Sequence, residues 1–171
     1  MSLLVETEKS GYDINKQFAG SIGYYWTASH QQIYKTLATM QHDGWVEFRL
    51  MEQQGKPDKK FYSITQTGLQ ELSNWARQPV KPQAERNELL IKLLLADLVG
   101  ADVIITELEQ LLGQQQKTLA EYQHIQSEFF TPEPTTAQTL QCKASFLTLR
   151  YGITSTTKNI HWLEEAIDLL K

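Results

Sequence analysis

The chain has 171 residues, 41% of them hydrophobic and 21% charged, which is ordinary for a folded protein of one or two small domains. Its net charge of −4 argues mildly against indiscriminate binding to nucleic acid, and the acidic excess falls in residues 81–171. A single cysteine, Cys142, excludes an intramolecular disulfide framework and a multi-cysteine zinc site.

The first predicted helix follows Ser10, because Asp13 three residues later completes an N-terminal cap. Ile14 and Phe18 form its apolar side, and it should end before residue 20. The aromatic run at residues 24–26 is expected to fill the joint to the next helix, with stacking on a ligand as the less favoured alternative.

The second predicted helix is the centre of the interpretation. Ser29 and Gln32 form a capping box that starts the helix near His30, and Gly44 supplies the stop. Its apolar stripe consists of Ile33, Leu37 and Met40. The opposite face is polar with little acid, which suits base edges and phosphates and indicates a DNA-recognition helix. By itself this face also fits a solvated amphipathic helix.

A β-hairpin should follow that helix. Residues 46–51 alternate apolar and polar, residues 54–59 are rich in turn formers, and residues 61–65 fit a returning strand. The hairpin carries a local excess of positive charge that suits phosphate contact, from Lys56, Lys59 and Lys60. The order of helix, helix and hairpin is that of a winged helix.

One more helix is predicted over residues 68–77, capped by Thr67 and Gln70. The prolines at residues 79–82 then form the clearest linker in the chain. They divide it into a domain of residues 1–80 and a second domain of residues 81–171.

Several short segments of the first half occur together in the order typical of one protein family. These segments are residues 10–14 (Ser-Gly-Tyr-Asp-Ile), 24–26 (Tyr-Tyr-Trp), 29–34 (Ser-His-Gln-Gln-Ile-Tyr), 55–62 (Gly-Lys-Pro-Asp-Lys-Lys-Phe-Tyr) and 64–68 (Ile-Thr-Gln-Thr-Gly). Over roughly residues 2–77 the chain resembles the PadR family of transcriptional regulators. Family members usually have a longer first helix than is present here. The resemblance implies a winged helix-turn-helix domain that binds DNA, most often as a repressor.

The residues expected at DNA are Ser29, His30, Gln31, Tyr34, Lys35, Lys56, Lys59 and Lys60. Among them Gln31 is assigned to base reading, Tyr34 and Lys35 to positioning on the backbone, and the three hairpin lysines to phosphates.

The second half is predicted to be entirely helical, with helices over residues 84–99, 102–130 and 137–170. The last helix repeats apolar residues in steps of three and four, which is typical of a coiled-coil seam. Two long helices joined by a short loop form an antiparallel hairpin, and seams of this length favour a homodimer over a monomeric bundle. The predicted dimerisation residues are Leu90, Leu94, Phe146, Leu149, Ile153, Ile160, Leu163 and Ile167. The fold class is therefore mainly α with a small β-hairpin wing, and the second domain resembles the helical dimerisation domain of longer PadR-type regulators.

Motifs of enzymes, metal sites and cofactor sites are missing from the sequence, since the histidines lack ligand spacing and no glycine-rich phosphate loop occurs. The apolar runs are too short to cross a membrane, so a cytoplasmic protein is expected. The leading interpretation is a dimeric repressor that binds a near-palindromic operator of double-stranded DNA. The alternative is a winged-helix interaction adaptor without DNA binding. The resemblance also allows a small aromatic effector, although nothing in the sequence identifies one.

Overall fold

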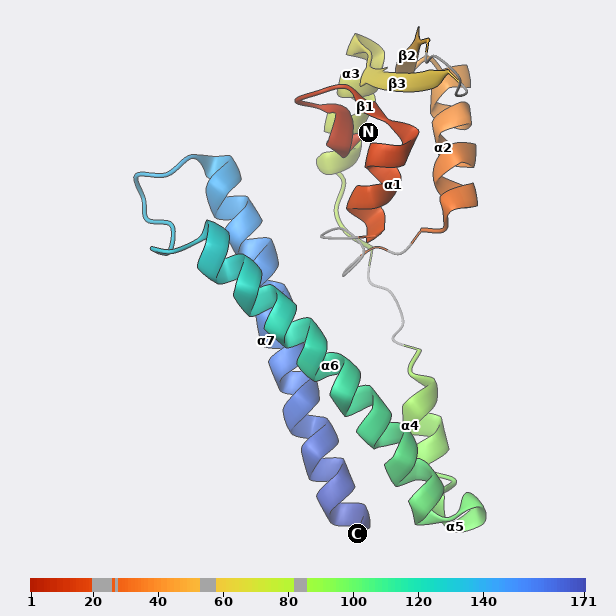
Figure 1. The fold of residues 1–171 in the computed structure, drawn as a ribbon, viewed down its shortest axis with the longest axis vertical. Coiled ribbons are helices and arrows are strands. Elements are labelled where there is room, and N and C mark those ends of the chain that lie inside the picture. Colours follow the sequence, from red (N-terminus) through yellow and green to blue (C-terminus); the bar gives the residue numbers. More distant parts are fainter. Residues whose placement is uncertain (20–25, 27, 53–57, 82–85) are drawn as a thin grey trace. The chain divides into compact units, whose positions relative to one another are not determined.

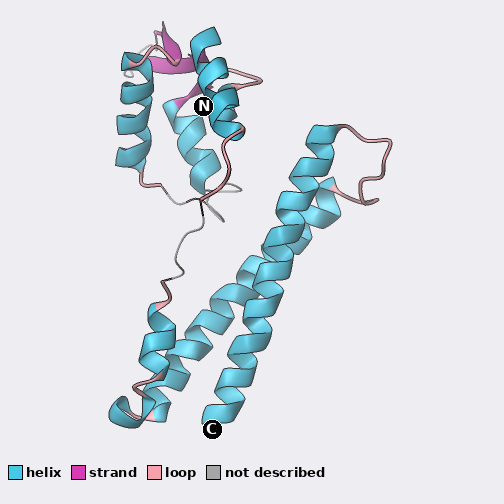
Figure 2. Ribbon diagram, turned by 180° about the vertical axis from the view of Figure 1, so that it is seen from behind, coloured by secondary structure: helices cyan, strands magenta, loops and turns pink. Residues whose placement is uncertain are grey.

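The computed structural model describes residues 1–19, 26, 28–52, 58–81 and 86–171. The chain forms two compact units, Met1–Gln83 and Ala84–Lys171, each considered by itself below. As predicted, the protein is mainly helical with one small antiparallel sheet (Figures 1 and 2).

The first unit is a small winged helix in which the hairpin of β2 and β3 follows two helices and precedes a third (Figure 1). Its elements are η1 (Ser2–Leu4), β1 (Lys9–Ser10), α1 (Gly11–Ala19), α2 (His30–His42), β2 (Val46–Met51), β3 (Lys59–Ile64) and α3 (Gln66–Ala76). The sheet order is β1-β3-β2, with Phe48 opposite Tyr62 in the hairpin. The sequence did not predict β1, because two residues are too short to show alternation.

The core of the first unit is built from apolar residues of η1, α1, α2, β2 and β3. The buried residues are Leu4, Ile14, Ile33, Leu37, Met40, Val46 and Tyr62. The predicted stripe of α2 is therefore confirmed as the inward face, and its other side is left to solvent. This burial fixes which face of α2 is available to a partner.

Local capping positions α1 as predicted. The backbone N–H of Asp13 donates to the Ser10 hydroxyl at 3.1 Å, and the N–H of Ser10 donates to the Asp13 carboxylate at 3.2 Å. Hydrogen bonds from Ser10, with a smaller effect of Lys59, lower the pKa of Asp13 below its usual value.

The predicted cap of the last helix in this unit is wrong. Thr65 caps α3 in place of Thr67, and its hydroxyl accepts the N–H of Gly68 at 3.0 Å. The same hydroxyl donates to the carbonyl of Gly44 at 2.7 Å. This contact with the end of α2 comes from tertiary structure, so spacing along the chain could not reveal it.

The second unit contains α4 (Glu88–Leu93), α5 (Ala96–Val99), α6 (Ala101–Phe129) and α7 (Leu140–Leu170). The single helix predicted over residues 84–99 is wrong, because the chain leaves helical geometry at Leu95 (φ −103°, ψ 11°), between α4 and α5. The helices α6 and α7 form the predicted antiparallel hairpin (Figure 2). Its best-packed end buries Ile104, Leu108, Leu163 and Ile167. None of the helices that the structure describes is long and apolar enough to span a bilayer.

Gly152 of α7 packs directly against Tyr122 of α6. A Cβ at Gly152 would lie 2.9 Å from Cζ of Tyr122, whose side chain is only 7% exposed. Gly113, the other glycine within a long helix, has nothing within 4 Å of an added Cβ.

We expect Gly113→Ala to raise the unfolding temperature, since alanine gains up to about 1 kcal/mol over glycine inside a helix. Gly152→Ala should lower the unfolding temperature, because the buried Tyr122 ring must shift and this strain exceeds the same gain. Thermal unfolding followed by circular dichroism compares the matched pair. Equal stabilisation by both alanines would contradict close packing at Gly152.

Candidate nucleic-acid interface

The exposed face of α2 presents polar side chains next to the start of the helix. Gln31, Tyr34 and Lys35 are all exposed, as are Ser29 and His30 at the helix start. Their arrangement agrees with the outward face predicted from the periodicity. Amide, hydroxyl, ammonium and imidazole groups supply both donors and acceptors for base edges and phosphates.

A complete capping box fixes the first turn of α2. The N–H of Gln32 donates to the Ser29 hydroxyl at 3.2 Å, and the N–H of Ser29 donates to Oε1 of Gln32 at 2.8 Å. This confirms the predicted start of the helix at His30. The capped first turn fixes the backbone that carries Gln31, the residue expected to read bases.

A glycine in α1 sets how closely α1 approaches α2. A Cβ at Gly11 would lie 2.7 Å from Cε1 of Tyr34, so a larger residue there would displace this ring from its present position. The Tyr34 ring also lies 4.6 Å from the ring of His30, measured between centroids. Tyr34 is 39% exposed, and it therefore combines packing against α1 with a surface position. Sequence reasoning assigned Tyr34 to the DNA backbone and did not detect this packing role.

The hairpin lysines differ in their surroundings. Lys56 lies outside the described residues. Nζ of Lys59 lies 3.7 Å from the carboxylate of Asp13 and 5.1 Å from the centroid of the Phe61 ring. Nζ of Lys60 lies 4.2 Å from the centroid of the Phe48 ring. Both side chains are therefore held against the wing while their positive charge remains near the surface.

Arg49 of β2 is a cation of the wing that the sequence reading missed. Its Nε donates to Oε2 of Glu8 at 2.8 Å, and a second guanidinium nitrogen contacts the other carboxylate oxygen. The hydrogen bond to Arg49 lowers the pKa of Glu8 and raises that of Arg49. The contact spans 41 positions in sequence, so no local pattern signals it. It neutralises one positive charge on the same hairpin.

The predicted dimerisation residues fall into two groups. Leu149, Leu163 and Ile167 are 8%, 4% and 5% exposed, so they are buried within the second unit itself. Phe146, Ile153 and Ile160 of α7 are half-buried. Leu90 and Leu94 are 45% and 81% exposed. Much of the a/d seam therefore packs inside the hairpin, because α6 covers it, and a partner could reach it only in part.

Among the described residues, no group of three or more His, Cys, Asp or Glu could hold a metal ion.

The fold and this interface define a winged helix-turn-helix protein with an added helical domain. The chain belongs to the PadR-like family of transcriptional regulators: residues 1–74 match that family, and residues 85–171 match the family described as virulence activator alpha C-term. A probable transcriptional regulator of Mycobacterium tuberculosis is 33% identical, with 98% of this chain and 93% of the relative covered.

Solved structures agree over nearly the whole chain. AphA, the virulence activator of Vibrio cholerae, is 32% identical with a TM-score of 0.78, covering 99% of this chain and 94% of its own. PadR of Bacillus subtilis in complex with operator DNA is 25% identical with a TM-score of 0.81, covering 99% and 95%. The same Bacillus protein in complex with p-coumaric acid gives a TM-score of 0.75, covering 99% and 94% at 25% identity. This protein is thus a transcriptional regulator of the PadR type.

Proposed function

We propose that this regulator acts as a homodimer that reads a near-palindromic operator in double-stranded DNA. The observation that carries the proposal is the capped start of α2, where Gln31, Tyr34 and Lys35 are exposed beside a basic hairpin. The operator complex of the Bacillus relative supports it. No catalytic step is part of the proposal, and a protein of this kind works in the cytoplasm, where the DNA is.

Each exposed group of α2 has a distinct task in this proposal. Gln31 reads a base edge, because an amide can donate and accept at once in the major groove. Tyr34 and Lys35 contact the backbone, with Ser29 and His30 at the same helix end. Lys56, Lys59 and Lys60 contact phosphates beside the groove, where Lys59 exchanges its ion pair with Asp13 for a phosphate oxygen.

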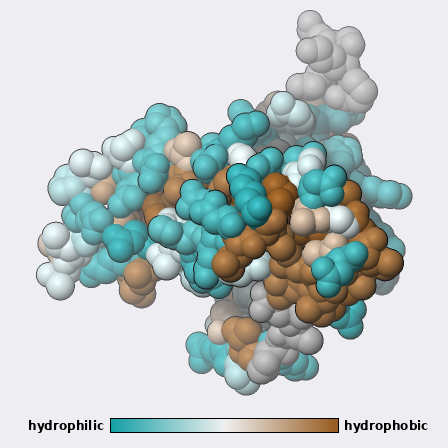
Figure 3. All heavy atoms as spheres, turned by 90° about the horizontal axis from the view of Figure 1, so that it is seen from below, coloured by the Kyte–Doolittle hydropathy of each residue, from teal (hydrophilic) through white to brown (hydrophobic). Residues whose placement is uncertain are grey.

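The second copy is held by an apolar surface of the second unit. The α4–α5 patch consists of Leu90, Ile91, Leu94, Leu95, Leu98 and Val99, which are 44–81% exposed. Figure 3 shows hydrophobic side chains gathered over this end of the unit. An exposed cluster of this size favours burial against a partner. Leu149, Leu163 and Ile167 contribute indirectly by holding the hairpin that presents the patch, and the half-buried Phe146, Ile153 and Ile160 of α7 add to the proposed interface along the hairpin.

Repression is the expected effect on transcription, because a relative that is 26% identical is the negative transcriptional regulator PadR of Bacillus subtilis. A dimer bound over a promoter would repress transcription simply by occupying the DNA. The complex of that relative with p-coumaric acid also favours control by a small aromatic effector.

Removing the base-reading amide tests the role of α2. Gln31→Ala should weaken binding to an operator selected from random oligonucleotides by roughly tenfold or more, and leave binding to random DNA nearly unchanged. The reason is that an amide at a base edge discriminates between sequences, whereas it adds little to phosphate contact. Affinities for both DNAs, measured at two salt concentrations, give the comparison.

Lys35→Ala is the matched control on the same helix. It should weaken both DNAs alike and flatten the salt dependence by about one unit, since it removes one phosphate contact. Equal losses on both DNAs for Gln31→Ala would assign that residue to positioning. Salt-independent binding by the unaltered protein would instead favour an interaction adaptor.

A further inference from the structure

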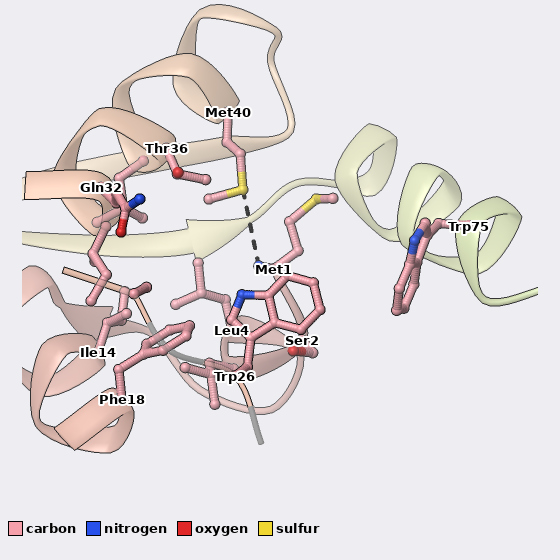
Figure 4. Close-up of a pocket in the computed structure, with 14 residues that line it drawn as sticks. Met1, Ser2, Leu4, Ile14, Phe18, Trp26, Gln32, Thr36, Met40 and Trp75 are labelled. Atoms are coloured by element: carbon pink, nitrogen blue, oxygen red, sulfur yellow. Dashed lines mark hydrogen bonds between the residues drawn. The ribbon is translucent and has the colours of Figure 1, made fainter. Parts of the chain in front are cut away.

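The inner flank of α2 offers no side-chain charge to a phosphate. It borders a pocket of about 720 Å³, and no described residue in the lining of this pocket has a charged side chain. The residues of α2 that Figure 4 labels there are Gln32, Thr36 and Met40. A further cation for the DNA backbone must therefore come from another surface of the unit. Arg49 of β2 is one that the proposed function leaves unused.

Arg49 belongs to a cluster of two cations beside one aromatic ring. In the antiparallel register Arg49 lies opposite Phe61, and Lys59 precedes Phe61 by two residues on β3, so the three side chains share one face of the sheet. Cζ of Arg49 lies 4.9 Å from the centroid of the Phe61 ring, and Nζ of Lys59 lies 5.1 Å from it. Lys60, the next residue after Lys59, contacts Phe48 on the other face. Two positive charges are therefore held beside the same ring.

Each of these two cations is paired with a carboxylate, and the two pairs differ. Nζ of Lys59 lies 3.7 Å from Oδ2 of Asp13, and the same carboxylate accepts the N–H of Ser10. Arg49 instead contacts both carboxylate oxygens of Glu8, with Nε at 2.8 Å from Oε2. Lys59 can therefore leave Asp13 while that carboxylate keeps a partner. Arg49 must break a bidentate ion pair before it can contact anything else.

The pair of Arg49 and Glu8 is open to exchange with a polyanion. Their side chains are 52% and 40% exposed, and an exposed pair of this kind contributes little to folding stability. A phosphate offers a guanidinium the same bidentate geometry as a carboxylate. Duplex DNA presents such phosphates in a dense row. A backbone phosphate can therefore replace Glu8 at little cost to the fold.

We propose that Arg49 is a phosphate-binding residue of the wing and that Glu8 competes with DNA for it. In the free protein the guanidinium is held by Glu8, and on DNA a backbone phosphate takes the place of Glu8 near the phosphate contact of Lys59. The exchange rests on the proposed function, because it requires DNA against the wing. Glu8 thereby lowers the affinity for all DNA alike, since phosphates carry no sequence information.

A double variant that preserves the net charge tests the contact. Glu8→Gln combined with Arg49→Ala removes one charge of each sign, so long-range attraction to DNA is matched to that of the unaltered protein. Loss of one phosphate contact should weaken binding to random DNA and to the operator alike by about fivefold, and flatten the salt dependence by about one unit. An unchanged affinity and salt dependence would show that the ion pair stays closed on DNA and would overturn the proposal.

Glu8→Gln alone tests the competition. It should tighten binding to random DNA by about threefold or more, because Arg49 is then free before DNA arrives. Glu47→Gln is the matched control, since Glu47 is an exposed residue of the same strand as Arg49 and forms no ion pair with a described residue. Asp13→Asn is unsuitable, because it would also disturb the cap of α1. Equal effects of Glu8→Gln and Glu47→Gln would reduce the result to net charge and overturn the competition.

Glu8→Gln combined with Arg49→Lys separates the charge from packing against Phe61. Lysine also binds phosphate, so this variant should keep the salt dependence that Arg49→Ala loses. If lysine fails to keep it in a protein whose circular dichroism is unaltered, Arg49 acts through packing and the proposal is wrong. Binding of the unaltered protein that is independent of salt would overturn the proposed function and the exchange together. A steep salt dependence that none of these variants changes would overturn the exchange alone.

Discussion

Gly68→Ala should unfold the first unit and abolish operator binding. A Cβ at this position would lie 2.0 Å from the carbonyl oxygen of Trp45 and 2.9 Å from Cγ1 of Ile64. The carbonyl cannot withdraw freely, because it accepts the N–H of Thr65 at 3.0 Å. The start of α3 would have to move away from the hairpin, at a cost of about 3 kcal/mol or more.

Gly113→Ala is the matched control, since the same substitution there meets nothing within 4 Å. Thermal unfolding by circular dichroism and intrinsic fluorescence should show a large loss for Gly68→Ala and none for the control. An unfolding temperature close to that of the unaltered protein, with operator binding retained, would mean that α3 can shift cheaply.

Patterns that depend on neighbours along the chain were predicted correctly. The caps at Ser10 and Ser29 involve residues three positions apart, so the sequence can suggest their hydrogen bonds. The apolar stripe of α2 is equally local. Thr65 caps α3 in place of Thr67, and its hydroxyl also donates to the carbonyl of Gly44, which lies in the turn after α2. Local propensity does not show which of the two threonines caps α3, because the tertiary contact decides it.

Contacts between distant segments could not be predicted from one sequence. Gly11 leaves room for the ring of Tyr34, and Gly68 leaves room for the carbonyl of Trp45. The local sequence places either glycine at the start of a predicted helix, but it does not show which distant group needs the space.

The seam of α7 illustrates an ambiguity in the hydrophobic pattern. Steps of three and four predict that a stripe is buried, but they do not identify what covers it. Within the protomer α6 covers Leu163 and Ile167, whereas Leu94 of α4 is 81% exposed. A test of dimerisation must therefore use exposed residues. A charge at Leu163 would unfold the hairpin whether or not a dimer forms.

Leu94→Lys combined with Leu98→Lys should give a folded monomer. These side chains are 81% and 79% exposed, so lysine is tolerated in one protomer but places charge in the proposed interface. In a two-fold dimer each substitution acts twice. Operator affinity should fall by about 10² or more while weak binding to random DNA persists, because one winged helix reads too few base pairs alone.

Sedimentation and footprinting together decide the outcome. The unaltered protein should protect two half-sites whose centres lie about 10 base pairs apart, or a multiple of that distance, because two recognition helices then reach one face of the duplex. Leu140→Lys is the control, since this α7 residue is 82% exposed and lies outside the α4–α5 patch. It should remain dimeric and retain the full footprint. A double variant that sediments as a folded monomer yet protects the whole operator would show that recognition does not depend on this dimer.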